Sequence, residues 1–226
     1  MPGFSHDVSD TLRVRVWGER ACFTRPEMKV ERVSYDVMTP SAGRGVLEAV
    51  LWKPQMRWIV GRIDVLNPIR KASVRRNEVG HKASVDNLVA AMAGRSARLG
   101  IDIEDARQQR AAVILRDVDY LVHARIRLTK RAGPDDTIGK YVEMLRRRSA
   151  AGQCFHRPYL GTREFAAEFA LVEGELPVPI GDTRDLGWML YDIDYSGPKP
   201  VPLFFEARLA AGSLAVPDPG SPELRR

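Results

Sequence analysis

Cysteines and long apolar runs are what this sequence most lacks. Its 226 residues include two cysteines, Cys22 and Cys154, which argues against a disulfide framework and against a metal site built from several thiolates. No apolar run approaches the ~18–20 residues of a membrane-spanning helix. The N-terminal stretch MPGFSHDVSD lacks the charged-then-apolar pattern of a signal peptide. These absences predict a cytoplasmic protein with no membrane partner.

Motifs for nucleotide hydrolysis and for zinc binding are also missing. Gly43 and Gly45 are not followed by the GK[ST] of a phosphate-binding loop. No spacing of histidine, cysteine and carboxylate residues proposes a zinc site. We therefore expect no cofactor and no metal.

Positive charge is the most informative bulk property. Lysine and arginine total 35 against 29 acidic residues, a net charge of +6. The cations gather in three groups, which are Arg62, Arg70, Lys71, Arg75 and Arg76, then Arg125, Arg127, Lys130 and Arg131, then Arg146, Arg147 and Arg148. Any one group could be an ordinary solvated surface. Three in one small chain favour a polyanionic partner such as nucleic acid.

Hydrophobic periodicity predicts a chain of mixed helices and strands. The predicted strands cover 12–16, 58–65 with a bulge at Gly61, 111–129, 165–172, 188–195 and 203–208. The predicted helices cover 40–52 and 84–98, and a third helix is capped by Asp135 or Asp136 and runs to Ala151. The first helix has a start signal at Thr39-Pro40 and an apolar stripe of Val46, Leu47, Val50 and Leu51.

This order predicts an α+β fold with a ferredoxin-like βαββαβ N-terminal domain and a smaller β-rich C-terminal region. The expected divisions are a loose N-terminus over 1–10, the ferredoxin-like domain over 11–172, the β-rich region over 173–217 and a disordered tail over 218–226. Within the first domain we expect a basic loop or mobile hairpin near 67–80 and an insertion near 80–109. The two basic strands would be neighbours, so that one sheet face would carry Arg13, Arg15, His123, Arg125 and Arg127.

Seven stretches carry a resemblance to a known family. They are SYDVMTPSAGRGVLEAVLWKP, IDVLNPI, RRNEV, GKYVEMLRRRSAAG, RPYLGTREFAAEF, DLGWMLYDIDYSG and FFEARLAAGSLAVP. In this order and spacing, from Val14 to Pro217, the chain closely resembles the Cas-five proteins of type I-C CRISPR systems, the Dvulg subtype of the RAMP superfamily.

The resemblance implies an endoribonuclease that cuts CRISPR repeat RNA and stays on the 5′ handle in the interference complex. The implied partners are that RNA and the other subunits of the type I-C Cascade complex, and double-stranded DNA stays open as a further partner. The implied chemistry is a metal-independent attack of a ribose 2′-hydroxyl on the adjacent phosphate, which leaves a cyclic phosphate. Two alternatives stay open: a non-catalytic subunit that caps RNA, and a metal-dependent DNA nuclease.

The resemblance also points to candidate catalytic residues. The family site has a tyrosine on the first helix and a Lys-His pair at the start of a later helix. Lys140 matches the lysine, whereas Tyr141 stands at the histidine position and Leu51 at the tyrosine position. We expect Lys140 to stabilise charge on the phosphate. A nearby ammonium would favour the phenolate of Tyr141, and His156 is the nearest titratable side chain in the sequence.

RNA binding is expected mainly from the cations of the predicted basic loop. These are Arg70, Lys71, Arg75 and Arg76, assisted by Arg13, Arg15, Arg125 and Arg127 on the predicted sheet face. His123 would be a further RNA contact on that face. Tyr35, just before the first helix, could stack on a base or simply pack in the core.

Overall fold

The computed structural model describes residues 7–95 and 99–226, and it contains one large antiparallel sheet with few helices. The strands are β1 (Leu12–Ala21), β2 (Met56–Val65), β3 (Arg70–Val79), β4 (Arg107–Leu128), β5 (Glu168–Leu171), β6 (Arg184–Asp194), β7 (Val201–Ala210) and β8 (Ser213–Ala215). The helices are α1 (Pro40–Val50), α2 (Val85–Met92), α3 (Ile103–Ala106), α4 (Ile138–Ala150) and a 3-10 turn, η1 (Pro26–Met28).

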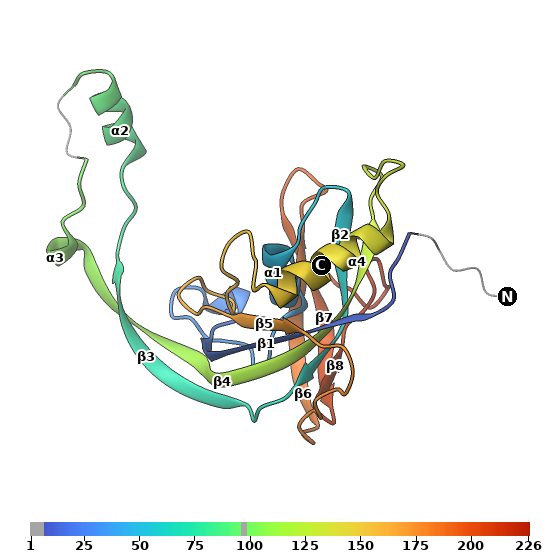
Figure 1. Cartoon of the computed structure of the whole chain (residues 1–226). Coiled ribbons are helices and arrows are strands. Elements are labelled where there is room, and N and C mark those ends of the chain that lie inside the picture. The colour runs from blue at the N-terminus through green and yellow to red at the C-terminus, as the bar shows by residue number, and fades with distance from the viewer. Residues whose placement is uncertain (1–6, 96–98) are drawn as a thin grey trace.

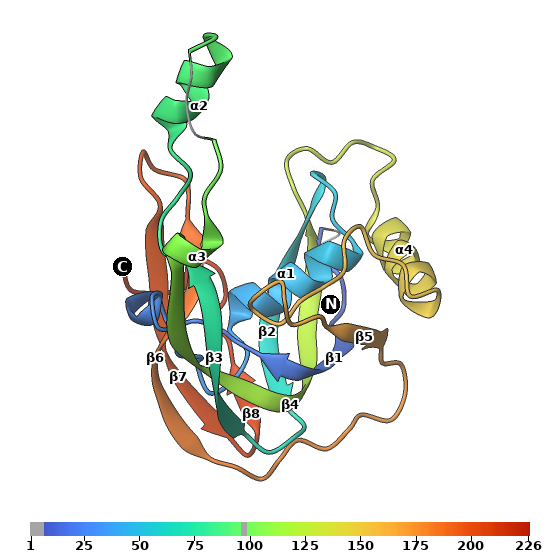
Figure 2. The same cartoon turned by 90° about the vertical axis from the view of Figure 1, so that its left-hand side faces the viewer.

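The strand order places β1 and β4 at the centre of the N-terminal half. The order is β5-β1-β4-β2-β8-β7-β6, with β3 paired to β4 outside this path. α1 and α4 lie on the same side of β1, β2 and β4 (Figures 1 and 2). Val14 lies opposite Val122 in the β1–β4 register, and both belong to one apolar cluster with Leu47 of α1 and Leu145 of α4.

α1 forms where the sequence predicts it. Thr39 is the N-cap, and its hydroxyl oxygen accepts a hydrogen bond from the Ala42 amide at 3.3 Å. Pro40 occupies the first helical position, where its missing amide proton has no cost. The predicted apolar stripe is fully buried. The bulge at Gly61 is also confirmed, because the β2–β4 register shifts between Val60 and Arg62.

α4 begins later than predicted. Thr137 caps it, and the Thr137 hydroxyl accepts from the Lys140 amide at 3.2 Å. The predicted caps, Asp135 and Asp136, are wrong because the Asp136 carboxylate instead closes the preceding turn by accepting from the Gly133 amide at 2.9 Å. None of the helices in the described ranges is long and apolar enough to cross a membrane.

The basic stretch near 67–80 is a strand, so of the two predicted forms, a loop or a hairpin, the loop is wrong. β3 pairs with β4 from Arg70 opposite Arg116 to Val79 opposite Arg107. Ala72 and Val74 alternate with polar residues and pack on a small cluster of Cys22, Ala112 and Ile114, which stabilises the extended conformation. The two strands form an arm that projects from the body of the molecule (Figure 1).

The tip of this arm is the predicted insertion near 80–109. Ser84 caps α2 as expected, with its hydroxyl accepting from the Asn87 amide at 3.2 Å. The helix ends at Met92 rather than Arg98, since Gly94 follows with a φ of +73°. Residues 96–98 of the predicted helix lie outside the described residues.

Both ends of the described chain are hydrogen-bonded to strands of the sheet. The tail over 218–226 is not disordered, because Arg225 and Phe204 exchange two backbone hydrogen bonds of 2.8 Å. At the other end, the Ser9 amide donates to the Ile126 carbonyl at 2.8 Å, so residues 7–10 are not loose. Residues 1–6 lie outside the described residues.

Candidate functional site

Lys140 and Tyr141 converge on one carboxylate at the start of α4. The Lys140 ammonium lies 3.0 Å from Asp136 Oδ1, and the Tyr141 hydroxyl donates to the same oxygen at 2.6 Å. The Tyr141 side chain is buried in the core, whereas the Lys140 side chain is half exposed. The cluster therefore presents a positive charge to solvent and hides its hydroxyl.

The electrostatics of this cluster are opposite to those predicted for Tyr141. The hydrogen bond from Tyr141, aided by the Gly133 amide and Lys140, lowers the pKa of Asp136 to about 2. Burial and the neighbouring carboxylate raise the pKa of Tyr141 to about 12. The expectation that Lys140 favours a Tyr141 phenolate is wrong, because burial and Asp136 both favour the protonated phenol.

His156 does not share a site with Lys140. Lys140 lies in the first turn of α4, and His156 follows the end of the helix at Ala150. At ~1.5 Å rise per residue, the stretch from Lys140 to Ala150 spans about 15 Å. His156 Nδ1 instead lies 3.2 Å from the carbonyl oxygen of Arg157.

Leu51 provides no hydroxyl at the position of the family tyrosine. Its side chain is fully buried, and its carbonyl accepts a 2.8 Å hydrogen bond from the Trp58 indole. The residue serves the packing between α1 and β2. Of the three catalytic positions that the sequence resemblance implies, Lys140 alone carries the expected residue type.

The predicted basic sheet face exists, and the strand register shows how it forms. Arg13 lies opposite His123, which in turn lies opposite Arg62 on β2. The remaining predicted members are Arg15, Arg125 and Arg127, which alternate with the core residues of β1 and β4. The strand register therefore confirms that these side chains lie on one face of the sheet.

Carboxylates neutralise part of this face. Arg15 makes a bidentate hydrogen bond to Asp119 with distances of 2.6 and 3.0 Å, which raises the pKa of Arg15. Arg125 lies 2.8 Å from Asp218 of the C-terminal tail. Any phosphate on this face has to compete with these ion pairs.

His123 is a buried structural residue, so its prediction as an RNA contact is wrong. The ring is 5% exposed, and Nε2 lies 2.6 Å from Asp64 Oδ2. Ser213 on β8 donates to the other Asp64 oxygen at 2.7 Å. Burial would raise the pKa of Asp64, but the bonds from His123 and Ser213 outweigh it and lower the pKa.

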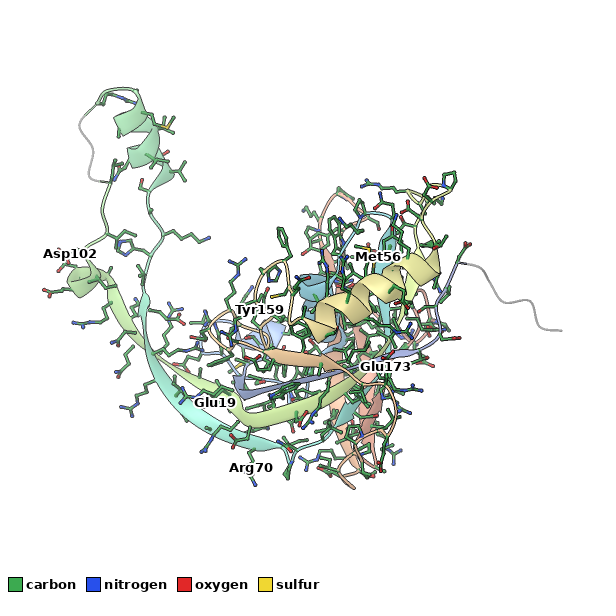
Figure 3. The ribbon with its side chains drawn as sticks, viewed as in Figure 1. Glu19, Met56, Arg70, Asp102, Tyr159 and Glu173 are labelled. Carbon is green, nitrogen blue, oxygen red and sulfur yellow. The ribbon has the colours of Figure 1, made fainter. Side chains whose placement is uncertain are left out.

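The four cations of the predicted loop lie on two faces of β3. Because β3 is a strand, Arg70 and Arg76 alternate with Lys71 and Arg75. Arg76 is largely buried and bound to Glu164, and Lys71 lies 2.7 Å from Asp36. Arg70 lies at the base of the arm (Figure 3), and Arg75 is exposed on the Lys71 face.

Tyr35 packs in the core and cannot stack on a base. Its side chain is 1% exposed, and its hydroxyl accepts a hydrogen bond from the Leu190 amide at 3.2 Å. Arg25 covers the ring at 4.5 Å from its centre. Of the two roles that the sequence left open, packing is confirmed.

The sequence interpretation missed Asp136 and Asp64. Asp136 precedes Lys140 by one helical turn, a spacing that signals a possible ion pair. Asp64 carried no such signal, because its partners His123 and Ser213 come from distant strands.

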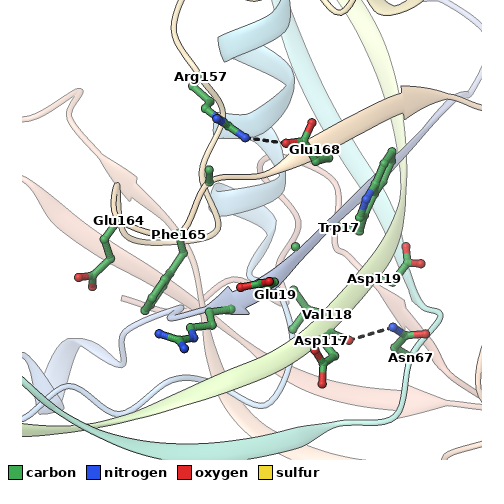
Figure 4. A pocket seen from close by; sticks show the side chains of 13 residues that line it. Trp17, Glu19, Asn67, Asp117, Val118, Asp119, Arg157, Glu164, Phe165 and Glu168 are labelled. Carbon is green, nitrogen blue, oxygen red and sulfur yellow. Dashed lines mark hydrogen bonds and ion pairs between the residues drawn. The ribbon is translucent and has the colours of Figure 1, made fainter.

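One cavity borders the basic sheet face and has charged residues of both signs in its lining. It has a volume of about 800 Å³ and lies between β1, β4 and the segment before β5 (Figure 4). Its acidic lining residues are Glu19, Asp117, Asp119, Glu164 and Glu168. Arg157 in the lining is paired with Glu168 at 2.6 Å. Arg20 also lines the cavity, and Asp119 and Glu164 are paired with Arg15 and Arg76, so its lining is of mixed charge.

Comparisons with a family model and with individual proteins point to the same family. The model of a CRISPR-associated protein family (Cas_Cas5) matches residues 11–217. A CRISPR pre-crRNA endoribonuclease Cas5d from Mannheimia succiniciproducens is 49% identical, over 97% of this chain and 100% of its own length. The protein of the same name from Thermus thermophilus is 44% identical, over 95% of both chains.

Solved structures agree at the level of the fold. A CRISPR-associated protein superposes with a TM-score of 0.70 at 22% identity, covering 99% of this chain and 100% of that one. A functionally uncharacterized protein from Streptococcus mutans gives a TM-score of 0.68 at 20% identity, covering 97% and 98%. With the family match over residues 11–217 and both relatives aligned over nearly their full length, the chain belongs to the Cas5d family of CRISPR-associated proteins.

Proposed function

We propose that this chain is a CRISPR pre-crRNA endoribonuclease, the activity for which both relatives are named. The observation that carries the proposal is the identity of 49% and 44% over nearly the whole of both relatives. After cutting, the protein stays on the 5′ handle of the RNA with the other subunits of the type I-C complex, in the cytoplasm. The exposed cations of β1, β3 and β4 support a polyanionic substrate.

The reaction is an attack by a ribose 2′-hydroxyl on the adjacent phosphate. The 2′-oxygen bonds to phosphorus, and the bond from phosphorus to the 5′-oxygen breaks. The 2′ proton is released, and the departing 5′-oxygen gains one, which leaves a cyclic phosphate and a 5′-hydroxyl. Negative charge accumulates on the phosphate oxygens as this happens, so a cation at that point lowers the barrier.

Lys140 is our candidate for that cation. Its ammonium is half exposed and is held in place by Asp136. Asp136, with a pKa of about 2, is a poor proton acceptor at neutral pH, and Tyr141 keeps its proton. We therefore assign charge stabilisation to Lys140 and no proton transfer to its two neighbours.

We further propose that β1, α1, β2, β4, α4 and β5 form a ferredoxin-like unit, within a domain over 11–172. The order β5-β1-β4-β2, with both helices on one side, supports it. β3 and the arm are then an insertion into this unit. Residues 173–217 form the β-rich C-terminal region, which adds β8, β7 and β6 beyond β2.

A second candidate function is a subunit that binds the RNA handle without cutting it. The observation in its favour is that Leu51 and Tyr141 replace the family's catalytic tyrosine and histidine, and both are buried. A third, a metal-dependent nuclease acting on double-stranded DNA, draws only on the general positive charge.

One experiment separates the three. The purified protein is incubated with its own repeat RNA and, in parallel, with duplex DNA, each with and without EDTA. Cutting of the RNA at one site, unaffected by EDTA, supports the endoribonuclease. RNA binding without cutting supports the capping subunit, and EDTA-sensitive loss of DNA supports the third function.

Lys140→Ala tests the assigned residue in the same assay. We expect RNA cleavage to slow by about 100- to 1,000-fold, as for removal of one electrostatic stabiliser. The matched control is Lys199→Ala, an exposed lysine between β6 and β7, which should cut at the wild-type rate. If Lys140→Ala also cuts at the wild-type rate, the assignment fails.

A further inference from the structure

A rigid segment runs along α1 just after α4. The Phe155 amide donates to the Ala49 carbonyl near the end of α1, and the Leu160 carbonyl accepts from the Cys22 amide at 3.0 Å. Gly161 adopts a φ of +85°, and a Cβ at this position would lie 2.0 Å from the Cys22 carbonyl oxygen. Only glycine fits there, so the backbone over 155–161 is fixed at both ends.

Three aromatic rings follow one another on this segment. The Phe155 and His156 ring centres are 6.1 Å apart, and so are those of His156 and Tyr159. The first pair meets edge to face, at 72°, and the second pair is nearly parallel, at 27°. Phe155 is 89% exposed, so the core does not account for its position. His156 is also exposed and Tyr159 is half-buried, and accessible aromatic rings are a common platform for the bases of single-stranded RNA.

Tyr159 also lines a cavity of about 290 Å³ beside the start of α1. Thr24, Thr39 and Ser41 contribute to the lining, and Gly45 leaves one wall open. Among the described residues, none of those that line this cavity carries a charge. A flat, uncharged heterocycle with donors and acceptors suits such a lining, because one aromatic wall stacks and hydroxyls can hydrogen-bond.

The two cavities differ in the charge of the residues that line them. The cavity in Figure 4 is lined by charged residues of both signs, whereas the smaller cavity is lined by uncharged residues that include Tyr159 and Gly161. Tyr159 lies on the side of the body that faces the arm (Figure 3). An RNA strand that follows the rings of Phe155, His156 and Tyr159 along α1 therefore reaches the neutral cavity beside Tyr159.

We propose that Phe155, His156 and Tyr159 form a stacking row for unpaired bases of the substrate RNA, and that the cavity beside Tyr159 holds one of these bases. This subsite gives His156 a binding role in place of the catalytic one predicted from the sequence. That the ligand is RNA rests on the proposed function.

The test uses the full-length protein and a single-stranded RNA that carries 2-aminopurine, a base whose fluorescence falls when it stacks. A 2′-deoxy sugar at each position that could be cut keeps the oligonucleotide intact. Phe155→Ala and Tyr159→Ala should each weaken binding by about 5- to 140-fold, as expected for loss of one base–aromatic stack. The salt dependence of binding should keep its wild-type slope, because no charge is removed.

Two further variants separate stacking from folding. Tyr159→Phe keeps the ring and should bind as the wild type does. Gly45→Leu adds a good helix former where a Cβ meets nothing within 4 Å. It should melt no lower than the wild type and still lose RNA affinity, because its side chain fills the cavity. Tyr195→Ala removes a ring that is 70% exposed on another part of the surface, and it serves as the control with unchanged binding.

The outcomes are distinct. If the wild type binds and quenches the RNA but Phe155→Ala and Tyr159→Ala bind equally well, the stacking row is refuted. If Gly45→Leu keeps full affinity, the cavity is not the base site. If the wild type binds neither this RNA nor the same sequence as DNA, the proposed function itself has failed.

Discussion

At the scale of single residues, Tyr141 shows how burial overrules a nearby charge. The Lys140 ammonium lies 5.7 Å from the centre of its ring, yet the phenol keeps its proton because it is buried and donates to Asp136. The sequence spacing could place Lys140 and Tyr141 together, but it could not show the depth of the ring. The acid–base prediction failed for that reason.

Tyr141→Phe tests this reading of the cluster. Loss of the hydroxyl raises the pKa of Asp136 from about 2 towards its ordinary value. A carboxylate whose pKa is lowered by folding adds stability above the unfolded pKa of ~3.9, and this stability disappears as the pH falls towards 2. The variant should therefore melt below the wild type at pH 7, and the gap should narrow between pH 5 and pH 3. A gap that is equally wide at pH 3 would show that the Tyr141 hydroxyl does not stabilise the ionised form of Asp136.

His123→Ala distinguishes a structural histidine from an RNA contact. Removing the ring leaves the buried Asp64 without one of its hydrogen-bond partners, which should lower the free energy of unfolding by about 1–3 kcal/mol. The salt slope of RNA binding should stay unchanged. His81→Ala, at an exposed histidine of the arm, should cost no more than about 0.5 kcal/mol in chemical denaturation. Normal stability with a reduced slope would restore His123 to the RNA-binding face.

At the scale of elements, the local sequence predicted the helix α1 but did not predict the polar strand β3. α1 carries a cap, an N-terminal proline and an apolar stripe within a few residues, so local sequence was enough to place it. β3 has only Ala72 and Val74 as its apolar side, and these pack on Ala112 and Ile114 of β4 and on Cys22, which follows β1. Its partner strand, β4, follows only after α2 and α3 in the chain, and no local pattern reveals that.

The strand geometry of the arm predicts unequal roles for its cations. Lys71→Ala with Arg75→Ala removes two charges from the exposed face. If both contact phosphates of single-stranded RNA, the log–log salt slope should fall by about 1.4. Arg70→Ala with Arg76→Ala should reduce it less, because Arg76 is largely buried against Glu164.

Measuring the RNA affinity of the two double variants at several salt concentrations shows which cations contact the RNA. Equal losses from both pairs would mean that all four cations reach the RNA, as in the loop that the sequence predicted.

At the scale of the whole molecule, the C-terminal region is tied to the N-terminal one by both backbone and side chains. β8 pairs with β2, where Ile63 lies opposite Leu214, and Ser213 bonds Asp64 inside the N-terminal half. The cavity beside Tyr159 likewise draws its lining from segments far apart in the sequence, from Phe23 to Leu190. Such sites depend on the complete fold, so motif spacing alone did not predict them.

The shared sheet predicts that the two regions unfold together. Thermal unfolding followed by tryptophan fluorescence and by circular dichroism should give one coincident transition, since Trp58 lies in β2 and Trp188 in β6. Two separate transitions would show that residues 11–172 and 173–217 are independent folding units.

The most direct test of the central claim is the chemical identity of the RNA ends. The protein is incubated with its repeat RNA in EDTA, and the fragments are analysed by mass spectrometry. Attack by the 2′-hydroxyl predicts a cyclic phosphate on one fragment and a 5′-hydroxyl on the other, and a 2′-deoxy sugar at the cut site should abolish both. Fragments with a 5′-phosphate and a 3′-hydroxyl, or RNA that is bound but left whole, would contradict the account.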